Sequence, residues 1–164
     1  MINEKLYNKT VSILVDAYFK ETLKSQNCMA CAVGNIIAAN NNYEIVKVSG
    51  KTYWMDKEGN YITPLWLNVV GTVEERILGF RVDTNQFLKM HKYDEATKKE
   101  IESSGYKLHE FALIENAFEK GHKGKDKMFN GLMSVINCLD EIHKNKDVLI
   151  TQNSKLMFKL QSVK

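Results

Sequence analysis

The chain is short of the residues that mark secreted, membrane or nucleic-acid-binding proteins. Its 164 residues include one proline and three cysteines, and Lys plus Arg exceed Asp plus Glu by only three. An odd number of cysteines does not make the disulfide framework of a small secreted domain. A formal charge of +3 is too small to indicate a nucleic-acid polymer as the partner. We therefore expect a protein of the reducing cytoplasm.

The sequence also lacks long apolar runs and the common catalytic motifs. The longest uncharged apolar stretch, residues 28–39, is too short to span a bilayer, and residues 1–5 lead into an amphipathic pattern rather than a signal peptide. There is no Walker loop, dinucleotide-binding glycine pattern, HExxH motif or serine elbow. These absences predict no membrane partner, and they favour binding without a cofactor over catalysis.

What is present is the composition of one soluble globular domain over residues 1–164. Hydrophobic residues make up 44% of the chain and charged residues 26%. A chain of this length buries about two thirds of the surface that its unfolded form exposes. Neither a metal ion nor a disulfide is needed to stabilise such a core.

The hydrophobic periodicity predicts a mainly helical α+β fold with a small antiparallel β-meander. We expect a helical hairpin in residues 1–42, a meander in 43–71, helices in 72–147 and a tail with equal helical and β character in 148–164. In more detail, we expect helices over residues 3–24, 27–40, 94–104, 108–121 and 126–143, strands over 43–48, 52–55 and 61–63, and a further strand over 65–70.

Two of the three cysteines lie in the almost uncharged segment 27–40. On a helix, Cys28, Cys31 and Asn35 share one face, and the segment is apolar nearly all round, which predicts a buried helix. The Cys28-x-x-Cys31 spacing also occurs in redox dithiols and in half of a zinc site. Core packing, thiol chemistry and metal binding are thus three alternatives. The histidines that could assist the last two are His91, His109, His122 and His143.

Several residues could bind a ligand. The lysines of the glycine-containing loop 121–127 could meet phosphates, and aromatic residues in and beside the meander could stack on a base. Side-chain amides on the helices could supply hydrogen bonds. The candidates are Asn35, Trp54, Trp66, Lys123, Lys125 and Asn130. The alternatives are a solvated loop and aromatic residues that fill the core.

Polar residues also interrupt the apolar stripes of the predicted helices. Glu115 lies in the stripe of residues 111–118, and Asn130 lies in that of residues 128–139. A polar group turned into a core must be hydrogen-bonded. Glu115, Asn130 and Asn35 are therefore candidates for an internal polar network or for the lining of a ligand pocket.

Five segments together resemble one protein family. They are the helix 6–17, the block Cys-Met-Ala-Cys-Ala-Val-Gly-Asn at 28–35, Ser-Gly-Tyr at 104–106, Ile-Glu-Asn-Ala-Phe-Glu at 114–119 and Met-Phe-Asn-Gly-Leu-Met at 128–133. They are similar to an uncharacterised family of small proteins from Bacteroidetes and their crAss-like phages. The resemblance implies a phage-associated accessory protein in the host cytoplasm. It supplies no catalytic residues.

Two functional hypotheses follow. The first is a non-enzymatic binding or accessory protein, which acts on a host protein or on a nucleotide-like ligand of host-defence signalling and which could form a homo-oligomer. The second is a thiol-redox or metal-binding protein centred on Cys28 and Cys31.

Overall fold

The computed structural model of the chain describes residues 4–25, 27, 29–65 and 95–143, without the side chains of Leu108, His109 and Ala112. These ranges contain five helices and one three-stranded antiparallel sheet. The predicted mainly helical α+β fold with a small antiparallel sheet is confirmed. The predictions for residues 66–94 and for the tail lie outside the described residues.

Helix α1 spans Glu4–Phe19 and ends earlier than predicted. The N–H of Thr22 donates to the carbonyl of Ala17 at 2.9 Å, and the N–H of Glu21 donates to that of Tyr18 at 3.2 Å. Glu21 has a left-handed backbone with a φ of 58°. These features make a Schellman motif, which usually has glycine at this position. Because Glu21 takes that position, the sequence carries no stop signal before Lys24.

Helix α2 spans Ala32–Asn40, so the prediction of a helix from residue 27 is wrong. Cys31 is the N-cap, and its Sγ accepts a hydrogen bond from the N–H of Gly34 at 3.2 Å. Before it, the side chain of Asn27 accepts a hydrogen bond from the N–H of Met29 at 3.1 Å. An Asx-turn of this kind competes with helix formation. Cys31 therefore precedes the helix rather than lying on one of its faces, and Cys28 lies outside the described residues.

The sheet has the order β1-β2-β3, with β1 at Glu44–Val48, β2 at Lys51–Met55 and β3 at Tyr61–Ile62. Ser49 and Gly50 join β1 to β2 with φ values of 52° and 79°, which is the left-handed pair of a type I′ turn. Trp54 lies opposite Ile45 on one side and Ile62 on the other. The three predicted strands are confirmed within one or two residues.

The other helices are α5 at Glu95–Glu102, α6 at Leu108–Gly121 and α7 at Lys127–His143. The predicted ends at Gly121 and His143 are confirmed. After α5 the chain turns at Gly105, which has a φ of 91°. Gly121 and Gly131 lie where α6 and α7 approach each other closely, against Ser134 and Phe118.

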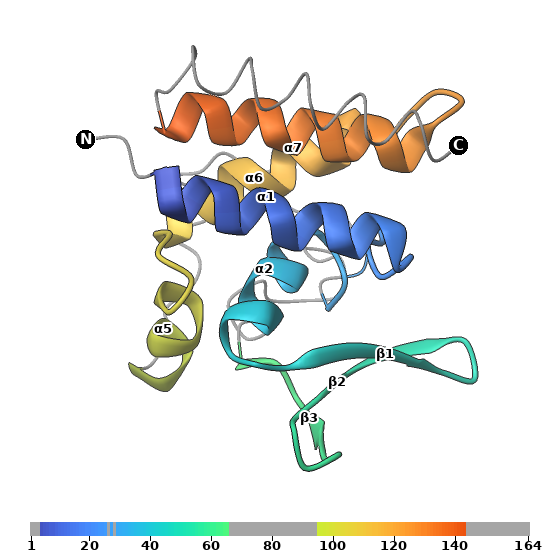
Figure 1. Ribbon diagram of the computed structural model, residues 1–164, viewed down its shortest axis with the longest axis vertical. Helices are drawn as coiled ribbons and strands as arrows, with labels where there is room; N and C mark the ends of the chain where they lie inside the picture. The colour runs from blue at the N-terminus through green and yellow to red at the C-terminus, as the bar shows by residue number, and fades with distance from the viewer. Residues whose placement is uncertain (1–3, 26, 28, 66–94, 144–164) are drawn as a thin grey trace.

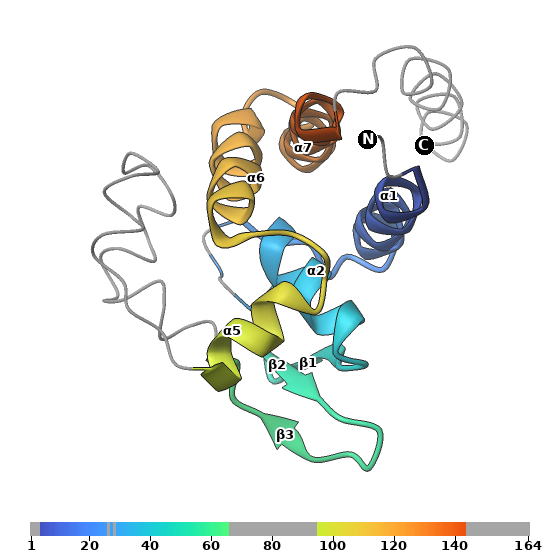
Figure 2. The same cartoon turned by 90° about the vertical axis from the view of Figure 1, so that its left-hand side faces the viewer.

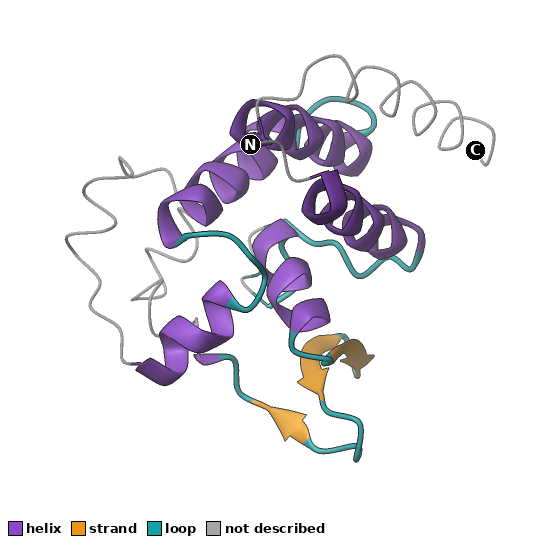
Figure 3. Cartoon of the chain, turned by 60° about the vertical axis from the view of Figure 1, so that its left-hand side comes forward, coloured by secondary structure: helices purple, strands orange, loops and turns teal. Residues whose placement is uncertain are grey.

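The helices surround α2, and the sheet lies at one end of the molecule. Figure 1 shows α1 and α7 side by side, with α2 leading from them toward β1. Figure 2 shows α1, α6 and α7 arranged around α2, and Figure 3 separates these helices from the strands by colour. The core joins both parts, because Ile36 and Ile37 of α2 belong to the same buried cluster as Trp54 of β2.

Candidate functional site

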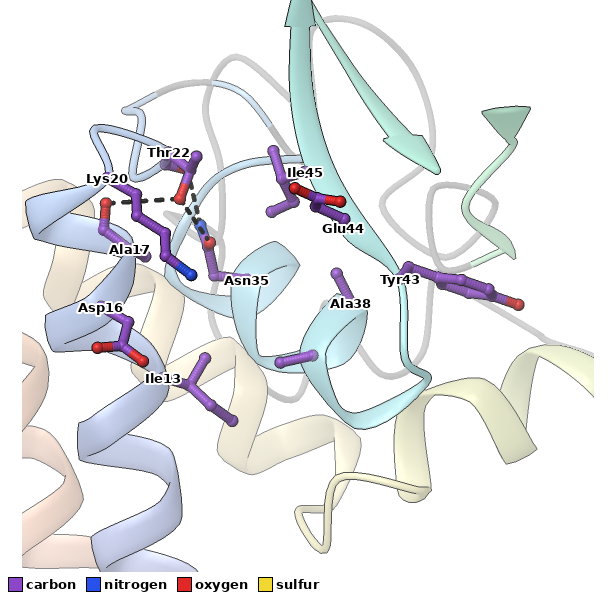
Figure 4. Close-up of a pocket in the computed structure, with 11 residues that line it drawn as sticks. Ile13, Asp16, Ala17, Lys20, Thr22, Asn35, Ala38, Tyr43, Glu44 and Ile45 are labelled. Atoms are coloured by element: carbon purple, nitrogen blue, oxygen red, sulfur yellow. Dashed lines mark hydrogen bonds between the residues drawn. The ribbon is translucent and has the colours of Figure 1, made fainter. Parts of the chain in front are cut away.

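A cavity of about 310 Å³ lies between α1, α2 and the start of β1, and we call it the α1–α2–β1 pocket (Figure 4). This volume lies at the small end of the range for ligand sites, which is about 300–1,000 Å³. Its lining residues are Ile13, Asp16, Ala17, Lys20, Thr22, Asn35, Ala38, Ala39, Tyr43, Glu44 and Ile45.

Asn35 lies against the loop that joins α1 to α2, and its side chain is 6% exposed. Its Nδ2 donates to the carbonyls of Thr22, Ala30 and Cys31 at 2.9, 2.9 and 3.0 Å. Its Oδ1 accepts from the hydroxyl of Thr22 at 3.4 Å, which is a long bond. The amide nitrogen therefore holds the loop in place, while the amide oxygen keeps capacity for a further donor in the pocket.

Charged side chains stand at the rim of the pocket. Asp16 lies in the last turn of α1 and Lys20 directly follows this helix, and both line the pocket (Figure 4). Glu44 begins β1 on the opposite side. All three are exposed. With two carboxylates and one ammonium group, the rim has a net formal charge of −1, because 1 minus 2 is −1.

The lining residues make the pocket suitable for binding a small molecule. They include neither a histidine nor a cysteine, so a nucleophile paired with an imidazole base is absent from this set. Ile13, Ala17, Ala38 and Ile45 supply apolar surface beside the charges. A pocket with apolar walls and a few polar groups is the usual form of a small-molecule site.

A second polar cluster is buried where α6 meets the start of α2. The Cys31 thiol and the Val33 N–H both hydrogen-bond to the Glu115 carboxyl, with Val33 at 3.5 Å. Nearby, the hydroxyl of Ser25 donates to Glu119 at 2.7 Å. Burial, with the neighbouring Glu119 as a smaller cause, raises the pKa of Glu115 to about 8, although the hydrogen bonds from Cys31 and Val33 oppose this shift. Glu115 thus belongs to an internal polar network, which is one of the two roles that the sequence predicted for it.

A third set of polar groups joins α1 to α7. The hydroxyl of Tyr106 donates to Oγ1 of Thr10 at 3.0 Å, and Thr10 donates to the carbonyl of Leu6 at 2.8 Å. Nε2 of His143 lies 2.9 Å from the same Tyr106 hydroxyl. Because that hydroxyl has only one proton to donate, the arrangement places a proton on Nε2 of His143. This histidine therefore serves a structural chain of hydrogen bonds.

The structure does not gather the predicted ligand-binding residues into one place. Trp54 is fully buried, and its Nε1 donates to the carbonyl of Met29 at 2.6 Å, so it fills the core as the alternative prediction had it. Lys123 and Lys125 are exposed in the loop between α6 and α7. Asn130 is exposed in the first turn of α7, and its Nδ2 donates to the carbonyl of Lys123 at 2.8 Å. Figure 1 shows this loop at the start of α7, away from α2.

Among the members of the predicted set that the structure describes, Asn35 alone lines the α1–α2–β1 pocket. Trp66 lies outside the described residues. The sequence analysis missed Asp16, Lys20 and Glu44. Nothing local in the sequence indicated that the end of α1 borders α2.

The cysteines and histidines that the structure describes are likewise dispersed. Cys31 is fully buried, and burial raises the pKa of the half-buried Cys138 to about 11. His122 packs its ring near that of Phe118. Cys28, His91 and the side chain of His109 lie outside the described residues. The described residues contain no group of three or more His, Cys, Asp or Glu that could hold a metal ion.

Comparisons with known protein families, with curated proteins and with solved structures find no match to this chain. Within the described ranges, no helix combines the length and the apolar character that crossing a bilayer requires.

Proposed function

We propose that this protein acts by binding, and that the α1–α2–β1 pocket holds a small molecule with an ammonium or guanidinium group next to a short apolar stem. The observation that carries the proposal is the pocket itself, with Asp16 and Glu44 at its rim and the Asn35 carboxamide oxygen inside. A cation gains from both carboxylates and can donate to Oδ1 of Asn35. The alanine and isoleucine side chains suit a short apolar stem.

A cationic ligand accounts for this pocket better than a polyphosphate does. Lys20 is the one cation among the lining residues, and two carboxylates oppose it. A nucleotide-like ligand would draw on Lys123 and Lys125, which lie at the separate loop between α6 and α7. The family resemblance supports an accessory role for such binding, in the cytoplasm of a phage-infected host, where a basic side chain of a host protein could enter the same pocket.

The test is the affinity of the full chain for small amines, measured by isothermal titration with putrescine, lysine and arginine and with glutamate and AMP as anionic probes. We expect an amine to bind, and we expect Asp16→Asn to weaken that binding about tenfold, the effect of losing one charge-assisted hydrogen bond. Lys20→Gln removes the competing cation, so it should leave amine binding unchanged or tighten it.

Glu58→Gln is the matched control, because Glu58 is an exposed carboxylate in the turn between β2 and β3, outside the pocket. It should bind the amines as the wild type does. Preference for glutamate or AMP, or absence of binding of every probe at millimolar concentration, would contradict the proposal.

A further inference from the structure

The three-stranded sheet has two apolar faces. A sheet that packs one face on a core needs only that face to be apolar. Ile45, Trp54 and Ile62 lie opposite one another in the register, and all three pack on the core. Side chains alternate along a strand, so the neighbouring positions face the other way. The outer sheet face consists of Glu44, Val46, Val48, Lys51, Tyr53, Met55 and Tyr61.

The outer sheet face carries accessible apolar side chains on β1 and β3. Tyr61 is 58% exposed and Val48 is 41% exposed, which makes them two of the most exposed large apolar side chains in the described residues. The rings of Tyr53 and Tyr61 are 5.1 Å apart between centroids. The outward face of a small antiparallel sheet is usually polar, and a contiguous apolar patch rimmed by charges is typical of an interaction site.

The two charges of this face stand at opposite ends of it. Glu44 pairs with Met55 at the start of β1, whereas Lys51 pairs with Val48 at the hairpin end. A two-fold axis that lies across the strands exchanges these ends between two copies. Each Glu44 then comes over a Lys51 of the second copy, displaced by about one strand spacing of 4.8 Å, and the apolar centres meet. The face is therefore complementary in charge to itself.

We propose that the outer sheet face is the contact surface of a two-fold symmetric homodimer. The apolar centre of Val46, Val48, Tyr53, Met55 and Tyr61 supplies the buried area, and the Glu44–Lys51 pairs set the orientation of the two copies. Figure 2 shows the sheet at one end of the molecule, below the helices. Glu44 also stands at the rim of the α1–α2–β1 pocket, so the dimer is measured in the absence of amines.

The first experiment measures the mass of the full chain by sedimentation equilibrium at about 100 μM, a concentration at which a micromolar dimer is populated. We expect a mass near twice the monomer mass of 18.9 kDa. The double variant Val48→Ser, Tyr61→Ser should raise the dissociation constant of the dimer about a hundredfold. Each of the two exposed apolar side chains accounts for about tenfold of this increase.

Leu113→Ser is the matched control, since Leu113 on α6 is 42% exposed and lies outside the sheet. It should dimerise as the wild type does. A monomeric wild type, or a serine double variant that dimerises as well as the wild type, overturns the proposal. A monomeric Leu113→Ser variant would move the contact to α6 and overturn it too.

A charge exchange tests the orientation with variants that leave the apolar centre intact. Glu44→Lys and Lys51→Glu each bring like charges together across the two-fold axis, and we expect each to weaken the dimer about three- to tenfold. The double variant Glu44→Lys, Lys51→Glu restores opposite charges and should dimerise as the wild type does. If the double variant is weaker than either single variant, the two-fold arrangement is wrong. Lys51 does not line the pocket, so its variants report on the dimer alone.

Discussion

Among single residues, Glu115 combines an ionisable group with nearly complete burial. It is 4% exposed, and its carboxyl meets the Cys31 thiol, the Val33 N–H and a second carboxyl, Glu119. A charged carboxylate in this place loses its hydration and is repelled by Glu119. Glu115 therefore has a pKa of about 8 and stays mostly neutral below that pH.

This pKa predicts a loss of stability as the pH rises. The folded protein binds the Glu115 proton more tightly than the unfolded chain does, so the stabilisation is complete below the ordinary pKa of 4.5 and is lost as the pH rises toward 8. We expect Glu115→Gln, which keeps a neutral side chain, to remove most of this slope in urea unfolding between pH 5 and about pH 8.

Glu102→Gln, at an exposed carboxyl on α5, is the control and should keep the wild-type slope. A Glu115→Gln protein whose stability falls with pH as steeply as that of the wild type would show that Glu115 is ionised in the folded state.

Among the elements, α6 and α7 depend on glycine at their contact. A Cβ on Gly121 would meet the Cβ of Ser134 and would lie 2.9 Å from both its hydroxyl and the carbonyl of Asn130. A Cβ on Gly131 would lie 3.0 Å from the ring edge of Phe118 and 3.3 Å from its carbonyl oxygen, so the approach is less close than at Gly121. The short loop of residues 122–126 leaves the two helices little room to separate.

We therefore expect Gly121→Ala to lower the free energy of unfolding by about 1–3 kcal/mol, the usual cost of overpacking. Gly131→Ala should cost less, and both are measured by thermal and urea unfolding. Adding Ser134→Gly to Gly121→Ala removes one of the clashing side chains and should recover part of the loss. Equal stability of Gly121→Ala and the wild type would show that α6 and α7 are farther apart than described.

At the scale of the whole molecule, one chain of hydrogen bonds links parts that are distant in the sequence. It runs from His143 on α7 through Tyr106 to Thr10 and Leu6 on α1. Beside it, the hydroxyl of Tyr7 donates to Asp140 at 3.1 Å. Burial lowers the pKa of His143, although Glu110 opposes this shift. The chain of hydrogen bonds thus contains a histidine that folding keeps neutral.

We expect Tyr106→Phe to destabilise the protein by about 1–2 kcal/mol, because His143 and Thr10 lose a buried partner. Tyr61→Phe, at an exposed hydroxyl, should change little. The contribution of His143 is present above its ordinary pKa of 6.5 and is lost as the pH falls, since the unfolded chain binds its proton more tightly. Denaturation at pH 5 and pH 7 measures both effects, and a Tyr106→Phe protein as stable as the wild type would contradict the role of this hydroxyl.

The sequence by itself determined the elements whose signals are local. The apolar stripe of α7, the end of α6 at Gly121 and the strands on either side of Ser49 and Gly50 each depend on residues a few positions apart, and each was predicted within one or two residues. An internal polar network was one of the two roles that the sequence predicted for Glu115. A carboxyl within an apolar stripe must find hydrogen-bond partners wherever the helix packs.

Only the tertiary structure decided which elements meet. The burial of Trp54, for example, brings its Nε1 to the carbonyl of Met29, which is distant in the sequence. The α1–α2–β1 pocket joins Asp16, Asn35 and Glu44, which come from three separate elements. Contacts of this kind follow from how helices and strands pack in space. The hydrophobic periodicity of each segment predicts the type of element but does not indicate which other element it packs against.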